Sequence, residues 1–424
     1  MKLAFITPRY GADIARGPEH VCRLFAEEVS GRHHVDVLTT CARDPRTWRN
    51  EYPEGADRMR GVLVRRFAVN QEHDRTAFRH LSTGMFGMPH GRDDEHEWVR
   101  RLGPASPALI EYLKRQHRSY DALVFFSLYH PTTVFGLAAA PERSVLFPCL
   151  QLDPALRFGI WSDLLGSVKA IGYLSTAERH QTQRFFRLPT PDEVVGLGIE
   201  APAQQTYPRH QQDPADDMAE GAHDQRGEGS QEVEPTEYLA GRGVPFRRRH
   251  RLYGAFVLYA GRVQPNNGCE ELLEYFDAYA ADNGTTTLVL MGAKLMKVPE
   301  HPHLRMGGVL PERERMIAYE AADVTVAPEP DDPAAIATLE SFAVGTPVLA
   351  SARNAAAADY CRLANAGLYY ATRDEFIEAL RLLMNDPRLR ARLGENGRRY
   401  IRVNHRWDAV LGRFERLMMR VRKP

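Results

Sequence analysis

The chain lacks any apolar run close to the roughly 18 residues that a membrane-spanning helix requires, although it is 424 residues long. Its first residues, Met1–Pro8, also lack the long apolar segment of a signal peptide and lead directly into a strand-like pattern. The five cysteines are odd in number and show no CxxC spacing, which argues against a disulfide framework and a zinc site. We therefore expect a cytoplasmic protein.

An excess of charge of one sign is also missing, because 55 Lys and Arg residues balance 55 Asp and Glu residues. No overall basic field draws the chain to nucleic acid or to anionic lipid. The sequence has neither a GxGxxG motif nor a Walker lysine, which excludes the usual dinucleotide and P-loop sites. Hydrophobic residues make up 43% and charged residues 26%, as in ordinary globular proteins, and the length favours two domains.

Short apolar runs alternate with helical patterns, which is typical of an α/β fold with parallel sheets. The strands expected in the first half are Lys2–Thr7, Val35–Thr40, Gly61–Phe67, Ala122–Ser127 and Ser144–Leu150. Those expected in the second half are Phe256–Ala260, Thr286–Met291, Val324–Ala327, Pro347–Ala350 and Gly367–Tyr370. The expected helices are Pro18–Ser30, Cys269–Ala281, Pro311–Ala321, Ala335–Val344 and Arg373–Met384. The pattern predicts two Rossmann-like domains, over residues 1–195 and 251–406.

Residues 203–250, between these domains, form a polar segment of a different kind. Asp213–Glu237 holds nine acids and one arginine, and Phe246–Arg251 then turns basic. This segment has too little apolar surface to offset the entropy of ordering it. The sequence therefore predicts a disordered insertion. Two interpretations stay open: a solvated insertion near a domain linker, or a regulatory or partner-binding arm.

Ligands of open α/β sheets bind beyond the carboxyl ends of the strands, where helix N-termini offer free N–H groups. Four segments are expected at such ends. In Thr7–His20, Gly11 and Gly17 either let the backbone approach a ligand or serve only as turn residues. In Phe147–Pro154, Gln151 follows an apolar strand, and Asp153 either takes part in the chemistry or caps a turn.

The third segment, Tyr259–Gly268, combines Arg262 with a glycine turn that leads into a helix. A permanent guanidinium charge and a helix N-terminus favour a diphosphate site, although a surface arginine beside a turn is the plainer interpretation. In the fourth segment, Asp332 and Glu340 bracket the first turns of a helix. Such acids either cap the helix or accept hydrogen bonds from sugar hydroxyls.

Together these segments resemble the retaining glycosyltransferases of the GT-B fold, in the family known as GT4, whose two Rossmann-like domains face each other across a cleft. The similarity covers nearly the whole chain except the polar insertion. Phe256–Gly268, Leu288–Gly292 and Asp323–Ser351 carry it best, and Leu339–Glu340 followed by Gly345–Val348 is its most specific part. By analogy with GT-B tails, we expect helix 407–424 to pack back on the first domain.

The resemblance implies transfer of a sugar, with retention, from a UDP- or GDP-linked donor, without a cofactor or a bound metal. It assigns the leaving diphosphate to Arg262, with Lys294 nearby, and the ribose hydroxyls to Glu340. Asp332 and Gln151 would orient the transferred sugar. The remaining residues expected to approach the donor are Gly17, Gly261, Asn267, Gly268 and Gly292.

Five positions depart from the family pattern. Pro18 replaces a glycine, Asn267 a lysine, Asp332 a glutamate, Gln151 a histidine and Leu152 an aspartate. These departures support a second hypothesis, in which the chain is a catalytically silent GT-B protein that acts as a binding module or as the partner of an active glycosyltransferase. A phosphorylase is disfavoured, because no lysine is suited to hold pyridoxal phosphate.

The acceptor is not encoded in a motif, and a glycan, a lipid-linked molecule or a small molecule all fit. Segment Arg43–Arg79 holds nine arginines. They form either a basic face that guides a phosphorylated or lipid-linked acceptor, with peripheral membrane contact, or ordinary solvated charge.

Overall fold

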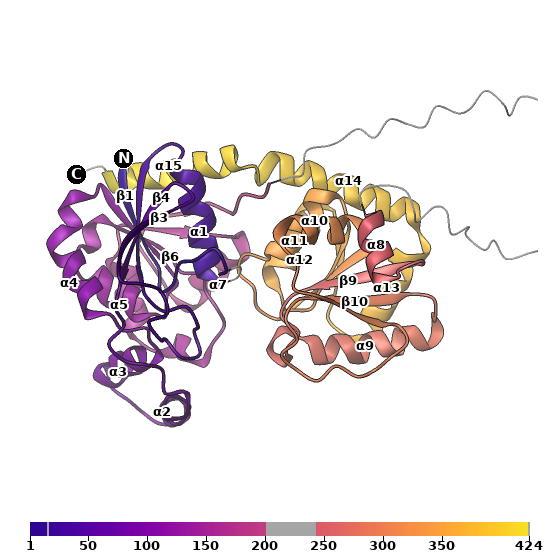
Figure 1. Cartoon of the computed structure of the whole chain (residues 1–424), viewed down its shortest axis with the longest axis horizontal. Coiled ribbons are helices and arrows are strands. Elements are labelled where there is room, and N and C mark those ends of the chain that lie inside the picture. Colours follow the sequence, from indigo (N-terminus) through magenta and orange to yellow (C-terminus); the bar gives the residue numbers. More distant parts are fainter. Residues whose placement is uncertain (15–16, 201–242, 423–424) are drawn as a thin grey trace, which may run out of the picture. The chain divides into compact units, whose positions relative to one another are not determined.

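The computed structural model describes residues 1–14, 17–200 and 243–422. Within that part, the chain forms two compact units. Unit 1 comprises Met1–Ile199, Asp331–Ala335 and Val403–Pro424, and unit 2 comprises Glu200–Pro330 and Ile336–Arg402. Each unit is built on one largely parallel sheet with helices on both faces (Figure 1). The α/β architecture with two parallel sheets, predicted from the sequence, is confirmed.

Among the described residues, unit 1 has an eight-stranded sheet in the order β3-β4-β2-β1-β5-β6-β7-β8, parallel except for β3. Its strands are β1 (Lys2–Ile6), β2 (His34–Thr40), β3 (Gly55–Met59), β4 (Val62–Phe67), β5 (Ala122–Phe126), β6 (Ser144–Phe147), β7 (Ala170–Tyr173) and β8 (Asp192–Val194). Its helices are α1 (Pro18–Val29), α2 (Arg75–Gly87), α3 (Arg92–Leu102), α4 (Pro107–Gln116), α5 (Pro131–Leu137), α6 (Ile160–Ser167), α7 (Thr176–Phe185) and α15 (Trp407–Arg422).

The two faces of the unit 1 sheet bury different partners because side chains alternate along each strand. Ala4 and Ile6 of β1 belong to a core that includes α3, α4 and α6. Phe5, between them, faces the other way and lies 6.0 Å from Phe414 of α15, ring centre to ring centre. Helix α15 therefore covers one face of the unit 1 sheet.

Within the described part, unit 2 has a six-stranded parallel sheet in the order β11-β10-β9-β12-β13-β14. Its strands are β9 (Phe256–Ala260), β10 (Thr287–Met291), β11 (Leu304–Gly308), β12 (Val324–Ala327), β13 (Val348–Ser351) and β14 (Gly367–Tyr370). Its helices are α8 (Val244–His250), α9 (Cys269–Asp282), α10 (Glu312–Ala321), α11 (Ile336–Val344), α12 (Ala355–Ala364), α13 (Arg373–Asn385) and α14 (Pro387–Asn404), the last of which runs past the unit's end.

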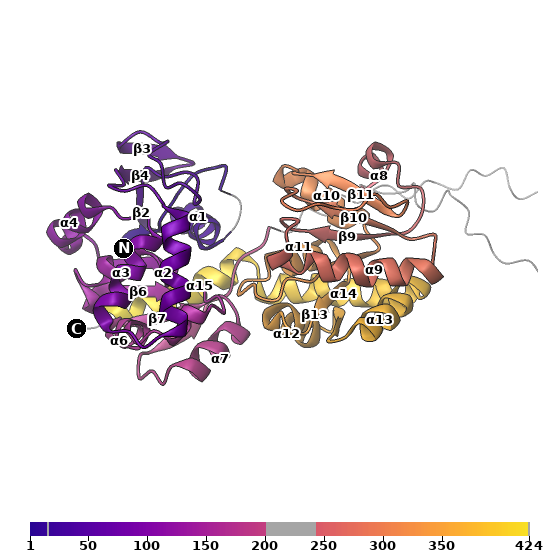
Figure 2. The ribbon, with the colours of Figure 1, turned by 90° about the horizontal axis from the view of Figure 1, so that it is seen from below.

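Strand β9 shows how the unit 2 core is divided. Val257 and Tyr259 point into a cluster with residues of α9, α13 and α14. Phe256, Leu258 and Ala260 point into a second cluster with residues of α8, α10 and α11. The helices thus lie on opposite faces of the sheet (Figure 2). A strand buried on both faces reads as a continuous apolar run, which is why the sequence predicted it with its correct ends.

Each sheet contains one point at which the strand order reverses, so that successive strands are added on opposite sides of it. In unit 1 this point lies between β1 and β5, and in unit 2 it lies between β9 and β12. Helices that follow such neighbouring strands leave on opposite faces, so a crevice opens beyond the carboxyl ends. A ligand site in unit 2 is therefore expected at the carboxyl ends of β9 and β12.

The predicted disordered insertion, residues 203–250, needs one correction. Residues 201–242 lie outside the described part, but Val244–His250 forms α8. Phe246 of α8 is buried, and the buried Arg247 donates to the carbonyl oxygen of Ala321 over 2.6 Å and lies 3.3 Å from Asp323. The apolar contact and the matched charge offset the entropy of ordering this end of the segment.

Candidate functional site

Past β9 and β10, the two loops continue side by side at the carboxyl edge of the unit 2 sheet. The Gly261 N–H donates to the Met291 carbonyl, and the Val263 N–H donates to the Ala293 carbonyl, each over 2.9 Å. A further bridge pairs Val263 with Lys294. Arg262 and Lys294 therefore sit on adjacent, hydrogen-bonded loops, and both side chains are exposed. This edge presents two cations.

Two of the predicted glycines sit where a side chain would collide with backbone. At Gly292 the φ angle is +145°, and an added Cβ would lie 1.8 Å from the Gly261 carbonyl oxygen. At Gly268, the N-cap residue of α9, φ is +71° and the Cβ would lie 2.4 Å from the Pro328 carbonyl oxygen. These glycines allow the loops after β9, β10 and β12 to meet at the switch point.

The buried Tyr259 holds the turn that carries Arg262. Tyr259 was not identified as a site residue from the sequence. Its hydroxyl donates to the Arg262 carbonyl over 2.9 Å and accepts from the Asn267 amide over 3.4 Å. The Asn267 oxygen accepts from Gln264 over 2.7 Å. Asn267 therefore braces the turn and supplies no positive charge. Burial raises the pKa of the Tyr259 hydroxyl well above its usual range, so it stays protonated and able to donate.

A carboxylate also lies at this edge. A Cβ added to Gly261 would lie 2.7 Å from an oxygen of Glu329, which follows β12. Negative charge beside an anionic ligand is unfavourable unless nearby cations balance it. The positive charges of Arg262 and Lys294 are therefore needed at this edge if it binds a phosphate.

Glu340 lies in α11, which follows β12, and is 7% exposed. Both of its oxygens are engaged by Arg315 of α10: Nη2 lies 2.5 Å from Oε1 and Nε lies 3.1 Å from Oε2. Burial lowers the pKa of Arg315, but the adjacent Glu340 carboxylate outweighs it and the net shift is upward. No sequence pattern predicts this bidentate ion pair, because it joins side chains of two separate helices, α10 and α11.

The residues predicted on the acceptor side belong to unit 1. Gly17 is the N-cap residue of α1 with φ at +78°, and Pro18 occupies the first turn of that helix, as its missing N–H group predicted. Glu19, in the same turn, is buried and lies 2.8 Å from Arg9. The acid next to Gly17 is therefore neutralised.

Gln151 lies in a loop, and three side chains form hydrogen bonds with the backbone of that loop. The Leu150 N–H donates to Glu178 of α7 over 2.9 Å, the Tyr129 hydroxyl donates to the Gln151 carbonyl over 2.5 Å, and the Leu152 N–H donates to Asp331. The Gln151 side chain itself is exposed. Burial raises the pKa of Glu178 to about 7 and that of Asp331 to about 6. The loop is positioned by two weakly acidic carboxyl groups and a tyrosine.

Asp332 belongs to a short segment, Asp331–Ala335, that groups with unit 1. Its Oδ1 accepts from the N–H groups of Ala334 and Ala335, over 3.2 and 3.0 Å. The structure thus shows the capping contact that was one of the two interpretations of this acid.

Several arginines of the Arg43–Arg79 segment have acidic partners. The pairs are Arg43 with Asp13, Arg46 with Asp44, Arg49 with Glu72 and Arg60 with Glu27. Arg66 is buried and donates to the Tyr10 carbonyl. Much of the positive charge of this segment is therefore balanced locally.

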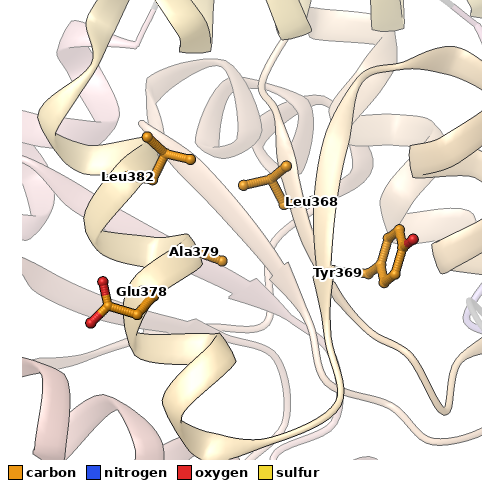
Figure 3. A pocket seen from close by; sticks show the side chains of 5 residues that line it. All are labelled: Leu368, Tyr369, Glu378, Ala379 and Leu382. Atoms are coloured by element: carbon orange, nitrogen blue, oxygen red, sulfur yellow. The ribbon is translucent and has the colours of Figure 1, made fainter.

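Of the predicted residues, the structure brings together Gly261, Arg262, Asn267, Gly268, Gly292 and Lys294 in unit 2. Glu340 belongs to the same unit through α11, whereas Gly17, Gln151 and Asp332 belong to unit 1. A hollow of about 580 Å³ in unit 2 is lined by Leu368 and Tyr369 of β14 and by Glu378, Ala379 and Leu382 of α13 (Figure 3). Because β14 is the far edge strand, this hollow contains none of the predicted residues.

Comparisons with known proteins agree with this architecture. Residues 246–400 match the model of a family described as glycosyl transferases group 1. No curated protein of similar sequence matches the chain. Solved structures match 99% of it: sucrose-phosphate synthase from Thermosynechococcus elongatus (15% identity, 99% of that chain, TM-score 0.63) and Anabaena HepE in complex with UDP (13% identity, 100% of that chain, TM-score 0.65).

A third similar structure is the α,α-trehalose 6-phosphate synthase from Burkholderia multivorans (12% identity, 99% of this chain, 98% of that chain, TM-score 0.64). At these identities the similarity establishes the fold. The chain has the GT-B fold, and its residues 246–400 carry the sequence pattern of group 1 glycosyl transferases.

Proposed function

We propose that this protein is a glycosyltransferase of the GT4 type that moves a sugar, with retention, from a UDP- or GDP-linked donor to an acceptor. One observation carries the proposal: Arg262 and Lys294 lie on hydrogen-bonded loops at the carboxyl edge of the unit 2 sheet, beside the point where the strand order reverses between β9 and β12. Doubly wound sheets bind nucleotides at such points. The match of residues 246–400 to the group 1 model supports the same class of donor.

The unit 2 site serves the leaving group. As the bond between the anomeric carbon and the phosphate oxygen breaks, negative charge grows on the diphosphate. In this proposal the guanidinium of Arg262, the ammonium of Lys294 and the N-terminus of α9 beyond Gly268 stabilise that charge. Gly261 and Gly292 let the two loops that carry these cations pack closely against their neighbours. The acceptor oxygen takes the place of the phosphate oxygen, and its proton passes to the departing diphosphate.

The unit 1 residues serve the sugars. Gln151, held by its braced loop, donates and accepts hydrogen bonds with hydroxyl groups but carries no proton to the reaction. Asp332 orients the transferred sugar, and Gly17 offers a close backbone approach. In unit 2, Glu340 and its ion pair mark the nucleoside end of the donor site.

A second candidate, a catalytically silent GT-B protein, is favoured by a specific observation. Asn267 stands where the family carries a lysine, and its amide group forms hydrogen bonds with Tyr259 and Gln264. One stabilising donor lost from such a site costs about 10²–10³ in rate. A silent protein would bind the nucleotide and turn nothing over unless a partner enzyme were present.

Turnover decides between these candidates. The purified protein is incubated with UDP- and GDP-linked sugars, with and without a panel of acceptors, and release of free UDP or GDP is followed. We expect release with one donor, and proton NMR of the product should show the anomeric configuration of the donor. An inverted product would contradict retention, whereas tight nucleotide binding without release would favour the silent protein.

A further inference from the structure

Glu178 of α7 joins two loops at the carboxyl edge of the unit 1 sheet. Its Oε1 accepts from the N–H of Leu150 over 2.9 Å, in the loop after β6 that we call the Gln151 loop (residues 148–153). Its Oε2 accepts from the N–H of Leu174, just after the neighbouring strand β7, over 2.6 Å. The side chain is fully buried. One carboxyl group therefore ties the Gln151 loop to the end of the next strand.

The contact with Leu150 matters because the Gln151 loop has an unfavourable backbone. Cys149 has a φ angle of +47°, in the left-handed region that residues other than glycine rarely adopt. A backbone of this kind persists only where surrounding contacts hold it. On the other side of Gln151, the N–H of Leu152 donates to Asp331. Carboxyl groups thus hold the residues on both sides of Gln151, whose own side chain is exposed.

We propose that Glu178 is a positioning residue for glycosyl transfer: as a carboxylate, it fixes the Gln151 loop so that the Gln151 amide meets the hydroxyl groups of a sugar. The inference rests on the proposed function, since it requires a sugar beside Gln151. Glu178 acts through the backbone of the loop and does not itself touch the sugar, because its side chain is fully buried.

The hold on the loop depends on the charge of Glu178. A carboxylate accepts with both oxygens, whereas protonation turns one oxygen into an O–H donor and leaves one backbone N–H with a weaker acceptor. Burial raises the pKa of Glu178 to about 7, so the charged form is lost as pH falls from 8 to 6.

Three titratable groups face Glu178: the Cys149 thiol, the Tyr173 hydroxyl and the Asp331 carboxyl group. Burial raises the pKa of the thiol and of the hydroxyl, so both stay neutral in this range. Burial also raises the pKa of Asp331, to about 6, and its negative charge adds to the upward shift in the pKa of Glu178. The two carboxyl groups that hold the loop therefore titrate close together.

Activity and stability then respond to pH in opposite directions. As pH rises through 7, ionisation of Glu178 restores both hydrogen bonds to the loops. The same ionisation removes the stability that the protonated, buried group contributes to the fold. A residue that only stabilised unit 1 would move activity and stability in the same direction.

The test measures two properties of the full chain from pH 6 to 8: release of UDP or GDP from the sugar donors, and hydrogen–deuterium exchange. After correction for the intrinsic pH dependence of exchange, protection of the peptides that contain Leu150 and Leu174 should rise about fivefold, the effect of one hydrogen bond. Turnover should rise with it. In Glu178→Gln, whose amide accepts only through its oxygen, both should stay at the low-pH level. Glu142→Gln, which changes an exposed carboxyl group of unit 1, should behave as the wild type does.

A second variant reads the same proton from the other side of the loop. Asp331→Asn keeps an oxygen for the Leu152 N–H but removes the charge, so the midpoint of both pH profiles should move to lower pH. If Glu178→Gln does not fold, this shift decides.

Two results would overturn the inference: protection of the Gln151 loop that does not change with pH in the wild type, or profiles of Glu178→Gln that run parallel to those of the wild type. If the wild type releases no nucleotide from any donor, the proposed function fails. The exchange profiles then still support or overturn the hold of Glu178 on the loop.

Discussion

The hydroxyl of Tyr259 donates a hydrogen bond to the carbonyl oxygen of Arg262 over 2.9 Å, from inside the core to the tip of the proposed diphosphate site. Tyr259 is fully buried and Arg262 is exposed. The backbone of the arginine turn is therefore anchored to the sheet, while its side chain extends from a fixed point. Anchoring of this kind reduces the ordering that a bound diphosphate must otherwise impose.

Removing that hydroxyl should weaken nucleotide binding without unfolding the unit. In Tyr259→Phe, the Arg262 carbonyl loses its hydroxyl donor and keeps the longer contact with the Cys269 thiol, and the Asn267 amide loses an acceptor. We expect this loss to cost about 1 kcal/mol. UDP affinity should fall three- to tenfold by calorimetry. Tyr370→Phe is the control, because the buried Tyr370 hydroxyl has no hydrogen-bond partner among the described residues. Equal affinities for the two variants would show that the anchor does not matter.

A methyl group at position 292 should disrupt the meeting of the loops. The Cβ of Gly292→Ala would lie 1.8 Å from the Gly261 carbonyl oxygen at a φ of +145°. We expect a loss of at least about 2 kcal/mol in the free energy of unfolding, with loss of UDP binding. In Gly284→Ala, the nearest atoms would lie 3.8 Å from the new Cβ, so that variant should be nearly neutral. Chemical denaturation of both variants gives the comparison.

The sequence predicted most of the central strands and missed the edge strands β3, β8 and β11, although it also missed the buried β7 and found the edge strand β14 with its correct ends. β9 and β12 are buried on both faces, so their apolar runs have clear ends. The edge strand β3 has largely exposed side chains, the edge strand β11 has a mixture of exposed, half-buried and buried residues, and β8 has three half-buried ones. These strands read as loops, because they have neither a continuous apolar run nor a clear alternation.

Some residues of the candidate site were also predictable from the sequence, and others were not. Arg262, Gly268 and Gly292 were predictable, because a glycine turn after a strand has a mark in the sequence. The pairing of Arg315 with Glu340 was not predictable, because these two residues are 25 positions apart in the chain and meet through side-chain geometry alone. Tyr259 left only a weak signal: a hydroxyl in an otherwise apolar strand, which needs a partner.

The stability of unit 1 should depend on pH through Glu178. Burial raises the pKa of this carboxyl group from 4.5 in its ordinary state to about 7 in the fold. The protonated form is thus favoured in the folded state, and its stabilising contribution is lost as pH rises from about 4.5 through 7. By the size of this shift, the loss approaches about 3 kcal/mol.

Thermal unfolding between pH 5 and 8 measures this effect. The melting temperature of the wild type should fall more over this range than that of Glu178→Gln, whose amide does not titrate. Glu142→Gln, which changes an exposed carboxyl group, should follow the wild-type slope. Parallel curves for the wild type and Glu178→Gln would contradict the raised pKa.

Helix α15 should contribute to the stability of unit 1. The Phe414 ring lies 5.8 Å from that of Phe25 and 6.0 Å from that of Phe5, centre to centre, and is fully buried. Phe414→Ala should cost about 3–5 kcal/mol, and removal of residues 406–424 should cost more. Met419→Ala is the control on the same helix, since Met419 is 51% exposed. An unchanged melting temperature for Phe414→Ala would refute the packing.

Titration of UDP and GDP into the wild type and Arg262→Ala tests the central claim most directly. We expect at least one nucleotide to bind the wild type, and Arg262→Ala to lose tenfold or more in affinity. Arg373→Ala, an exposed arginine of the same unit at α13, should bind as the wild type does. If binding is equally strong with and without the Arg262 guanidinium, or if the wild type binds neither nucleotide, Arg262 does not form a diphosphate site.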